Sequence, residues 1–344
     1  HIMGLGTNQT TITTSANFIP KMWSDEVIAA YKQKLVLGNL VTNISFKGKK
    51  GDTLNIPVPA RGEASVKAAN TQVNLIADTA GVVQVLINRH FEYSKLYEDI
   101  AEMQALTSMR RFYTDDAGFA LAKRIDRDLH LIGASFNGGA PGAASTAYEA
   151  AVIGGDGTTP FSGTTPGNGT ALTDAAIRKM IQTLEDQDLN SDELSLVIPP
   201  VEAAVLRGIA RFTEQAFVGN GDTLKTGRLG NLYGVEVFTS TNCPWIHVNS
   251  ATSTQSVTFS SAAPTGGAFV DELGNTVNWS SGSDTKYRAG MLLHKDAMCL
   301  ATQQDVRSQS QYKQEYLGTL VTSDTVYGTK ELRDYAALAF VMPS

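Results

Sequence analysis

The segment between residues 41 and 91 constrains the fold more than any other part of the chain, because it is patterned as strand but has almost nothing to bury. The sequence GDTLNIP at residues 51–57 predicts a turn and an extended strand, and the alternation around Val85 predicts a strand that returns beside it. Residues 61–78 between the two strands are mostly small and polar. A ribbon of only two strands is marginal alone in water. We therefore expect this hairpin to rest on a partner surface.

An amphipathic arm and a long helix flank the ribbon. On its N-terminal side, Ser24 is a predicted helix N-cap, and an apolar stripe runs from Trp23 to Leu35. On its C-terminal side, the pattern from Asp99 to Gly133 predicts a spine helix roughly 50 Å long. The heptad register is not kept, which argues against a free coiled coil. An arm, a projecting hairpin and a spine are suited to gripping neighbouring copies, so we interpret the chain as an assembly protein.

The rest of the chain predicts a mixed core of helices and strands. Residues 133–172 are rich in small and polar residues and predict a long surface loop. Thr173 is a predicted cap for a helix with apolar residues up to Leu184, and Leu194–Ile198 predicts a buried strand. A second helix is expected to follow, with apolar residues at Val201, Val205, Ile209 and Phe212. The later segments are a strand at 233–238, a Ser/Thr-rich insertion at 239–286, and mainly strands from 291 to 342 with a polar stretch at 303–314.

Composition and charge exclude several classes of function. The formal net charge of -6 argues against binding nucleic acid by general electrostatics. Cys243 and Cys299 do not make a disulfide framework, and we expect both as buried thiols in a reducing compartment. The longest apolar run, at residues 335–342, is far shorter than the ~20 residues needed to cross a bilayer. The N-terminus does not match a secretory signal. We expect a cytosolic protein without a membrane span.

No constellation of residues predicts a catalytic, cofactor or metal site. The glycine-rich residues 154–157 lack the lysine that a phosphate loop needs. Asp126 and Asp128 point in different directions on the spine helix, and we expect them on a solvated face or in salt bridges. The triplet His294-Lys295-Asp296 has no nucleophile beside it. The histidines outside the N-terminus, none of them at a spacing that suits zinc, are His90, His130, His247 and His294. We expect that the protein is not an enzyme and has no cofactor.

One basic cluster lies at the turn of the ribbon, at Lys47, Lys49 and Lys50. It is interpreted either as a solubilising group at an exposed turn, or as a contact with carboxylates such as Glu98 on the spine of a neighbouring copy. Charge pairs of that kind mainly set register and partner choice. The full set of candidate contact residues between subunits is Phe18, Trp23, Lys47, Lys49, Lys50, Arg61, Asp115 and Asp116.

Five motifs follow one another in a recognisable order along the chain. FIPKMWS at 18–24 opens the arm, GDTLNIP at 51–57 lies in the ribbon, and AKRID at 122–126 lies near the end of the spine. LVIPP at 196–200 and GNLYGVEVFTS at 230–240 follow. Taken in this order over nearly the whole chain, they resemble the major capsid proteins of tailed bacteriophages, which have the HK97-like coat fold.

The resemblance implies an α+β HK97-like fold with an N-terminal arm, an extended β-hairpin loop, a peripheral domain around the spine helix and an axial α/β domain. It implies that copies of the chain form pentamers and hexamers, which close an icosahedral shell around phage genomic DNA without sequence-specific binding. Portal, scaffolding and cement proteins are the further partners, and the virion, assembled in the host cytoplasm, is the location. The implied parts are the arm at 1–40, the extended loop at 41–92, the peripheral domain at 93–172 and 303–334, and the axial domain at 173–302 and 335–344 with an insertion at about 245–286.

Two other classes of function stay open at the level of sequence. Arms and ribbons also occur in phage tail-tube and sheath subunits. A hydrolase with a site around His294 is the weaker alternative.

Overall fold

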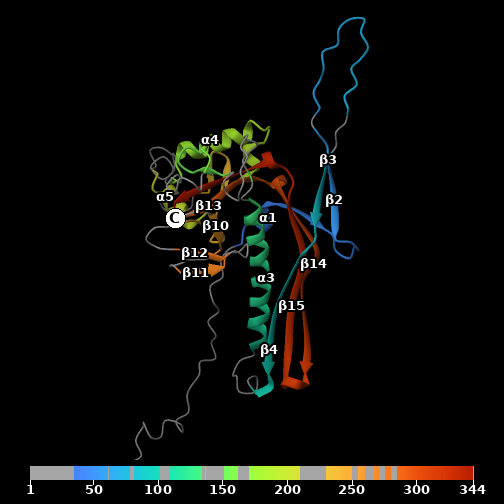
Figure 1. Ribbon diagram of the computed structural model, residues 1–344, viewed down its shortest axis with the longest axis vertical. Coiled ribbons are helices and arrows are strands. Elements are labelled where there is room, and N and C mark those ends of the chain that lie inside the picture. The colour runs from blue at the N-terminus through green and yellow to red at the C-terminus, as the bar shows by residue number, and fades with distance from the viewer. Residues whose placement is uncertain are drawn as a thin grey trace, which may run out of the picture.

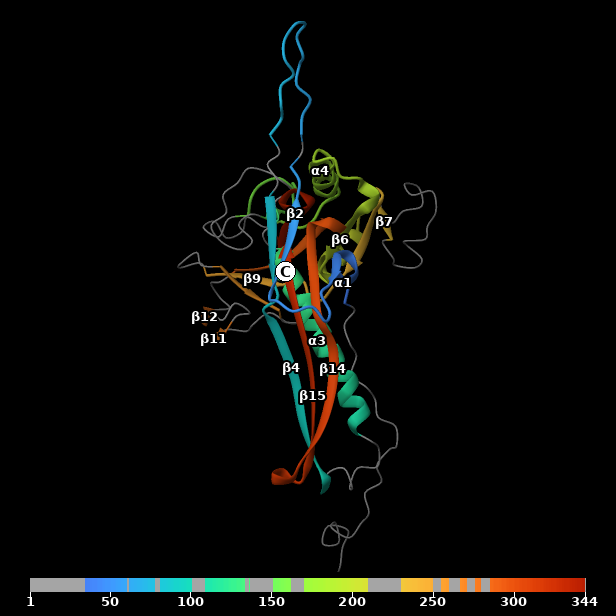
Figure 2. The same ribbon diagram turned by 90° about the vertical axis from the view of Figure 1, so that its right-hand side faces the viewer.

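The computed structural model describes residues 35–60, 62–77, 81–100, 109–133, 136, 151–161, 170–209, 230–249, 255–259, 267–270, 276–279 and 285–343. Within these ranges the subunit is elongated, with three parts along its long axis (Figure 1). A hairpin projects at one end, a compact body lies in the middle, and a narrow sheet flanked by one helix extends to the other end (Figure 2). The predicted arm helix with Phe18 and Trp23, and Arg61 of the ribbon, lie outside the described residues.

The body is built on an eight-stranded sheet with the order β10-β9-β13-β6-β8-β7, to which β16 and β5 are added beside β13. The long strand β13 organises this sheet, because it pairs antiparallel with β6, β9 and β16. The strands are β5 (Val152–Ile153), β6 (Leu194–Ile198), β7 (Asn231–Leu232), β8 (Val235–Thr239), β9 (Trp245–Val248), β10 (Gln255–Thr258), β13 (Thr285–His294) and β16 (Ala337–Pro343).

Helices cover both faces of this sheet. On β6, Leu196 and Ile198 belong to the core under α4 (Asp174–Glu185) and α5 (Pro200–Arg207). Val197 faces the other way and packs in the core formed by α1 (Leu37–Leu40) and α3 (Met109–Gly133). The prediction of a buried strand is therefore confirmed, and its physical reason is a sheet sandwiched between two helical layers.

The predicted start of α4 is also confirmed. The hydroxyl oxygen of Thr173 accepts a hydrogen bond from the backbone N–H of Ala176 at 3.1 Å, which satisfies one of the free donors of the first turn. The predicted apolar face of α4, from Ile177 to Leu184, is buried.

The second predicted helix is present as α5, but Val201 and Val205 of its apolar spacing do not lie on its buried face. Val201 and Val205 are 41% and 37% exposed, and the buried residues are Glu202, Ala203 and Leu206. The carboxylate of Glu202 accepts a hydrogen bond from the backbone N–H of Leu172 at 3.0 Å, which holds this face of the helix inward. Burial raises the pKa of Glu202. A buried side-chain acceptor therefore decided the orientation that hydrophobic spacing alone missed.

A second, four-stranded sheet has the order β1-β14-β15-β4 and carries α3 on one face (Figure 2). Its strands are β1 (Thr42–Ser45), β4 (Arg89–Glu98), β14 (Met298–Lys313) and β15 (Gly318–Glu331), and the turn between β14 and β15 is the 3-10 helix η3 (Gln314–Tyr316). Alternate residues of β4, among them Phe91 and Tyr93, are partly covered on the α3 side, whereas their neighbours in sequence are exposed.

Two predictions concern this sheet and its helix. Of the spine helix predicted from Asp99 to Gly133, the structure describes residues 99–100 and Met109–Gly133 as helical, and residues 101–108 lie outside the description. The polar stretch at 303–314 is mostly strand, because residues 303–313 continue β14 and pair with β15. Its polarity reflects exposure on both faces of the sheet, not a loop.

The predicted surface loop and the Ser/Thr-rich insertion both contribute to the core of the body. In the predicted loop at 133–172, β5 pairs with β16, and Phe161 packs edge-on against Tyr287 at 5.2 Å between ring centroids. In the Ser/Thr-rich insertion, β9 and β10 extend the eight-stranded sheet and bury Ile246 and Val257. Within the described part of this insertion, β11 (Gly267–Val270) and β12 (Thr276–Trp279) form a separate hairpin.

Two glycine-to-alanine variants, one in the packed core and one on the spine helix, test the packing of the eight-stranded sheet. A Cβ added at Gly290 on β13 would lie 2.7 Å from the carbonyl oxygen of Val197 and 2.9 Å from the ring of Phe340. We expect Gly290→Ala to lower the free energy of unfolding by about 1–3 kcal/mol, as overpacked cores do. Gly118 lies inside α3 with no heavy atom within 4 Å of an added Cβ, so Gly118→Ala should stabilise by about 0.5–1 kcal/mol. Urea unfolding of both variants checks this, and a shift of the same sign in both would contradict the packing.

Candidate assembly interface

The ribbon predicted from the sequence is present and is anchored at its root. Strands β2 (Thr53–Val58) and β3 (Gly81–Leu86) pair antiparallel along their full length. Val85 is fully buried in a small cluster with Cys299 and Ala301 of β14. A Cβ at Gly328 of β15 would lie 2.3 Å from the carbonyl oxygen of Leu86, so glycine at this position lets the root lie close to the sheet.

Beyond this root the loop has no core. Residues 62–77 are all exposed, and they form two extended legs joined by a turn at residues 68–71, where Thr71 bonds back to the carbonyl of Ala68. Asn70 adopts a left-handed conformation with φ 60°, which suits an asparagine at a tight turn. Figure 1 shows this loop projecting far from the body. Its exposed apolar side chains are Val66 (99%), Val73 (64%), Leu75 (88%) and Ile76 (63%).

The basic turn lies against the start of β14. Lys47 forms an ion pair with Asp305, and the ammonium of Lys49 lies 5.9 Å from the ring centroid of Phe46. Gln303 donates from its side chain to the backbone oxygens of Lys49 and Gly51, both at 3.1 Å. Lys47 therefore has a partner within its own subunit. The contact of this cluster with a neighbouring spine stays a prediction.

The two predicted acidic contacts on α3 have different surroundings. Asp115 is exposed. Asp116 accepts a hydrogen bond from the hydroxyl of Tyr93 at 2.9 Å, which ties α3 to β4. Asp116 thus has a role inside the subunit whether or not it contacts another copy.

The far end of the four-stranded sheet is a second exposed apolar region, which the sequence analysis missed. Around the turn between β14 and β15, Tyr312, Tyr316 and Leu317 are 48%, 62% and 67% exposed. The hydroxyl of Tyr312 donates to Asp99 at 2.8 Å. Leu317 has φ 46°, a left-handed conformation that is uncommon for leucine.

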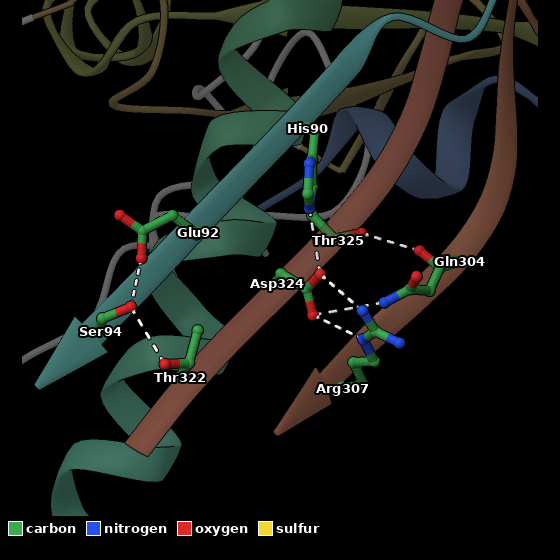
Figure 3. Close-up of polar contacts among 8 residues, drawn as sticks. All are labelled: His90, Glu92, Ser94, Gln304, Arg307, Thr322, Asp324 and Thr325. Carbon is green, nitrogen blue, oxygen red and sulfur yellow. Dashed lines mark hydrogen bonds and ion pairs between the residues drawn. The ribbon is translucent and has the colours of Figure 1, made fainter. Parts of the chain in front are cut away.

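A polar network on the face of this sheet opposite α3 joins β14, β15 and β4 (Figure 3). Asp324 of β15 accepts hydrogen bonds from Arg307 at 2.8 and 3.2 Å and from Gln304 at 3.3 Å, and His90 Nε2 lies 3.0 Å from it. The hydrogen bond from Arg307 holds the pKa of Asp324 below its usual range. The pairing of β14 with β15 shifts register between Thr302 and Gln304 and again between Gln304 and Arg307. The Asp324 network spans the second of these irregularities.

Two buried carboxylates on α3 connect the spine to both sheets. Asp126 accepts a hydrogen bond from the backbone N–H of Leu37 at 3.0 Å and one from the side chain of Asn242 at 2.6 Å. Asp128 accepts from the hydroxyl of Tyr327 on β15 and lies 3.4 Å from Arg124. Each is only 2% exposed, so the prediction of a solvated face is wrong. The alternative prediction, a salt bridge, is confirmed for Asp128, which pairs with Arg124.

A buried histidine lies beside Asp126, and a buried arginine binds the loop after β8. His130 Nε2 lies 3.7 Å from Asp126, and burial lowers the pKa of His130 to about 4. The guanidinium of Arg288 donates to the backbone oxygens of Thr241 and Cys243 and stacks 4.6 Å from the ring centroid of Trp245. The Arg288 contacts hold the loop after β8 against β13, and Asn242 ties the same loop to Asp126 of α3.

The histidine and the cysteines that the sequence raised as candidates for catalysis are held by hydrogen bonds or buried in the core. His294 lies 2.6 Å from Glu193 through Nε2 and accepts from the backbone N–H of Asp296 through Nδ1, so both ring nitrogens are engaged. Burial raises the pKa of Cys243 to about 12 and that of Cys299 to about 11, which suppresses thiolate chemistry.

No group of three or more His, Cys, Asp or Glu among the described residues is arranged to hold a metal ion. No helix in the described ranges has the length and apolarity to span a bilayer.

A comparison with protein families identifies the fold. Residues 96–299, more than half of the chain, match the model of the family described as "Phage capsid protein". The chain belongs to the phage capsid protein family. It is a major capsid protein, a subunit of the shell, and its location is the virion. The predictions of a phage capsid protein and of a mixed fold of helices and strands are confirmed.

Solved structures show the same fold at low sequence identity. The structure described as "Mycobacterium phage Che8" superposes with a TM-score of 0.64 at 20% identity, covering 94% of this chain and 97% of that one. The capsid of "Cyanophage P-SCSP1u" gives 0.66 at 17% identity, covering 99% and 97%. The capsid of Helicobacter pylori bacteriophage KHP30 gives 0.64 at 13% identity, with both chains fully covered. No curated protein sequence matches the chain.

The Asp126 contacts predict a large loss of stability on truncation. Asp126→Ala leaves the Leu37 N–H and the Asn242 amide without their acceptor in a buried site. We expect the free energy of unfolding to fall by about 2–4 kcal/mol in urea titrations. Asp115→Ala on the exposed part of the same helix is the control and should change it by no more than about 0.5 kcal/mol. Equal effects of the two variants would contradict the role given to Asp126.

Burial of His130 predicts that the subunit loses stability in mild acid. The unfolded chain binds a proton at His130 below its ordinary pKa of 6.5, whereas the folded chain does not until about pH 4. Stability therefore falls as the pH drops from 6.5 towards 4. His130→Gln should make the unfolding free energy less dependent on pH in that window, measured by urea titration at stepped pH. An unchanged slope would assign the dependence to another group.

Proposed function

We propose that this capsid protein forms pentamers and hexamers that close an icosahedral shell around phage genomic DNA, with the HK97-like arrangement of arm, extended loop, peripheral domain and axial domain. The four-stranded sheet with α3 corresponds to the peripheral domain, and the eight-stranded body corresponds to the axial domain. Thr42–Ser45 and the start of β4, placed by the sequence in the extended loop, pair with the peripheral sheet.

The exposed extended loop is the single observation that carries this proposal. Isolated subunits rarely expose aliphatic side chains as fully as Val66 and Leu75 on a segment with no core of its own. Full burial of such a side chain contributes about 1.5–3 kcal/mol. A neighbouring subunit supplies the missing surface, because a closed shell places one against every subunit.

Electrostatic contacts set how neighbours meet. The side chains of Lys50 and Asp115 are exposed and make no hydrogen bond or ion pair within the described part of the chain. They are the members of the predicted charge set with the most freedom to pair between copies, whereas Lys47 and Asp116 also have internal partners. Phe18, Trp23 and Arg61 complete the proposed contact set as predictions from the sequence.

Further partners follow from the same proposal. Portal, scaffolding and cement proteins contact the shell, and assembly takes place in the host cytoplasm. The net charge of -6 suits a container that holds DNA without trapping it. The shell role requires no catalytic activity of the subunit.

Replacing residues 62–77 with a short Gly-Ser link tests the proposal. The ends of β2 and β3 already lie side by side, so the subunit should fold with an unchanged unfolding transition. Electron microscopy should show no closed shells, because the loop no longer covers a neighbour. Closed shells from the loopless chain would contradict the proposal, and tubes from the full-length chain would indicate a tail component instead.

A matched pair of double variants separates loop chemistry from loop length. Val66→Ser with Leu75→Ser removes two exposed apolar side chains and should impair shell formation. Glu63→Ser with Asn74→Ser changes two exposed polar residues of the same legs and should assemble normally.

A further inference from the structure

The distal part of strand β14 has one edge that no described strand pairs with. This unpaired edge begins after the residues that contact β1 and the basic turn. Along residues 299–302 it is paired with β1, and the turn at residues 46–51 then contacts it through Gln303 and the Lys47–Asp305 ion pair. From Arg307 to Lys313 it pairs regularly with β15 on one side only. No other described strand pairs with this part of β14.

In an antiparallel sheet, successive residues direct their backbone N–H and C=O groups to opposite sides of the strand. This alternation identifies which backbone groups of β14 point away from β15. The Asp99 N–H donates to the carbonyl of Leu317 at 2.9 Å, which places the backbone groups of β15 residues 319, 321 and 323 towards β4. The alternate residues 320, 322 and 324 therefore bond to β14, opposite Gln311, Gln309 and Arg307. Ser308, Ser310 and Tyr312 consequently direct their backbone N–H and C=O groups away from the sheet.

This edge lacks the protection that edge strands commonly carry. Between Ser308 and Tyr312 the sequence SQSQY contains no charge and no proline, and the register shifts of β14 lie before it. The opposite edge strand, β4, carries Glu92, Lys95 and Glu98. Residues 305–312 are exposed on both faces of the sheet. Such an edge is a template for an added strand.

The same chain contains a segment that fits this template. Residues 72–77 form the returning leg of the extended loop, are exposed and pair with no described strand. Val73 and Leu75 alternate with Gln72 and Asn74, as in a strand with one apolar face. The leg has six residues and the open edge from Arg307 to Lys313 has seven. Since the leg carries no charge, it meets Arg307 and Lys313 without repulsion.

We propose that residues 72–77 of one subunit add as a strand to the β14 edge, residues 307–313, of a second copy. The inference rests on the proposed function, and it specifies how the loop binds: by main-chain pairing rather than by side-chain contacts alone. Val73 and Leu75 give the added strand its apolar face, and the half-exposed Tyr312 gives the edge an apolar side chain beside it.

Cysteine pairs test the pairing directly. Neighbouring strands lie about 4.8 Å apart, within the range of Cα separations that a disulfide bridges. Ser310→Cys is combined in turn with a single cysteine at each position from Gln72 to Ile76, and shells are oxidised and run on non-reducing gels. We expect linked oligomers for one or two adjacent positions. Ser310→Cys with Lys179→Cys on α4 is the unlinked control, and the native Cys243 and Cys299 are buried.

A backbone variant tests the same edge without cysteines. Ser310→Pro removes an outward N–H that β15 does not use, so the isolated subunit should keep its unfolding transition. The assembled fraction should fall roughly tenfold, whereas Ser310→Ala, which keeps the N–H, should assemble as wild type. Wild-type shells with no cross-link at any leg position, or normal assembly of a folded Ser310→Pro chain, would overturn strand addition alone. Absence of shells from the unmodified chain would instead overturn the proposed function.

Discussion

Two buried carboxylates on one turn of α3 hold the subunit together. Asp126 binds the backbone of α1 and the loop after β8, and Asp128 binds Tyr327 of the four-stranded sheet. Because residues two apart on a helix point in different directions, one short segment of the spine reaches two separate parts of the molecule. Buried charges are tolerated only where partners satisfy them, so these contacts specify how helix, body and peripheral sheet meet.

On this frame, the subunit exposes surfaces that a free-standing protein would cover. The extended loop is anchored at Val85 but has no core beyond β2 and β3, and the distal part of β14 is paired on one side only. Both features lie far from the body, along the long axis of the molecule (Figure 1). In the proposed contact between copies these are complementary halves of an interface, and the surfaces that one chain leaves uncovered are those that join many chains.

Local sequence signals predicted an element correctly where interactions among its own residues determine its structure. The Thr173 cap, the apolar face of α4 and the ribbon formed by β2 and β3 were all predicted, because capping and periodicity act within a few residues. The face of α5 was not, since the contact from Leu172 to Glu202 joins residues thirty positions apart. The distal half of β14 was not recognised as a strand, because a strand exposed on both faces has no hydrophobic alternation.

The sequence by itself determined the class of molecule: an assembly subunit with a projecting ribbon, a spine helix and a mixed core, similar to phage capsid proteins. It also indicated that the ribbon has no core of its own and must pack against another surface. Only the tertiary structure decided that Asp126 and Asp128 are internal joints, that Lys47 pairs within its own subunit, and that β14 ends in an unprotected edge. The physical reason is that hydrophobic periodicity is a local property, whereas the partner of a polar group is set by segments distant in sequence.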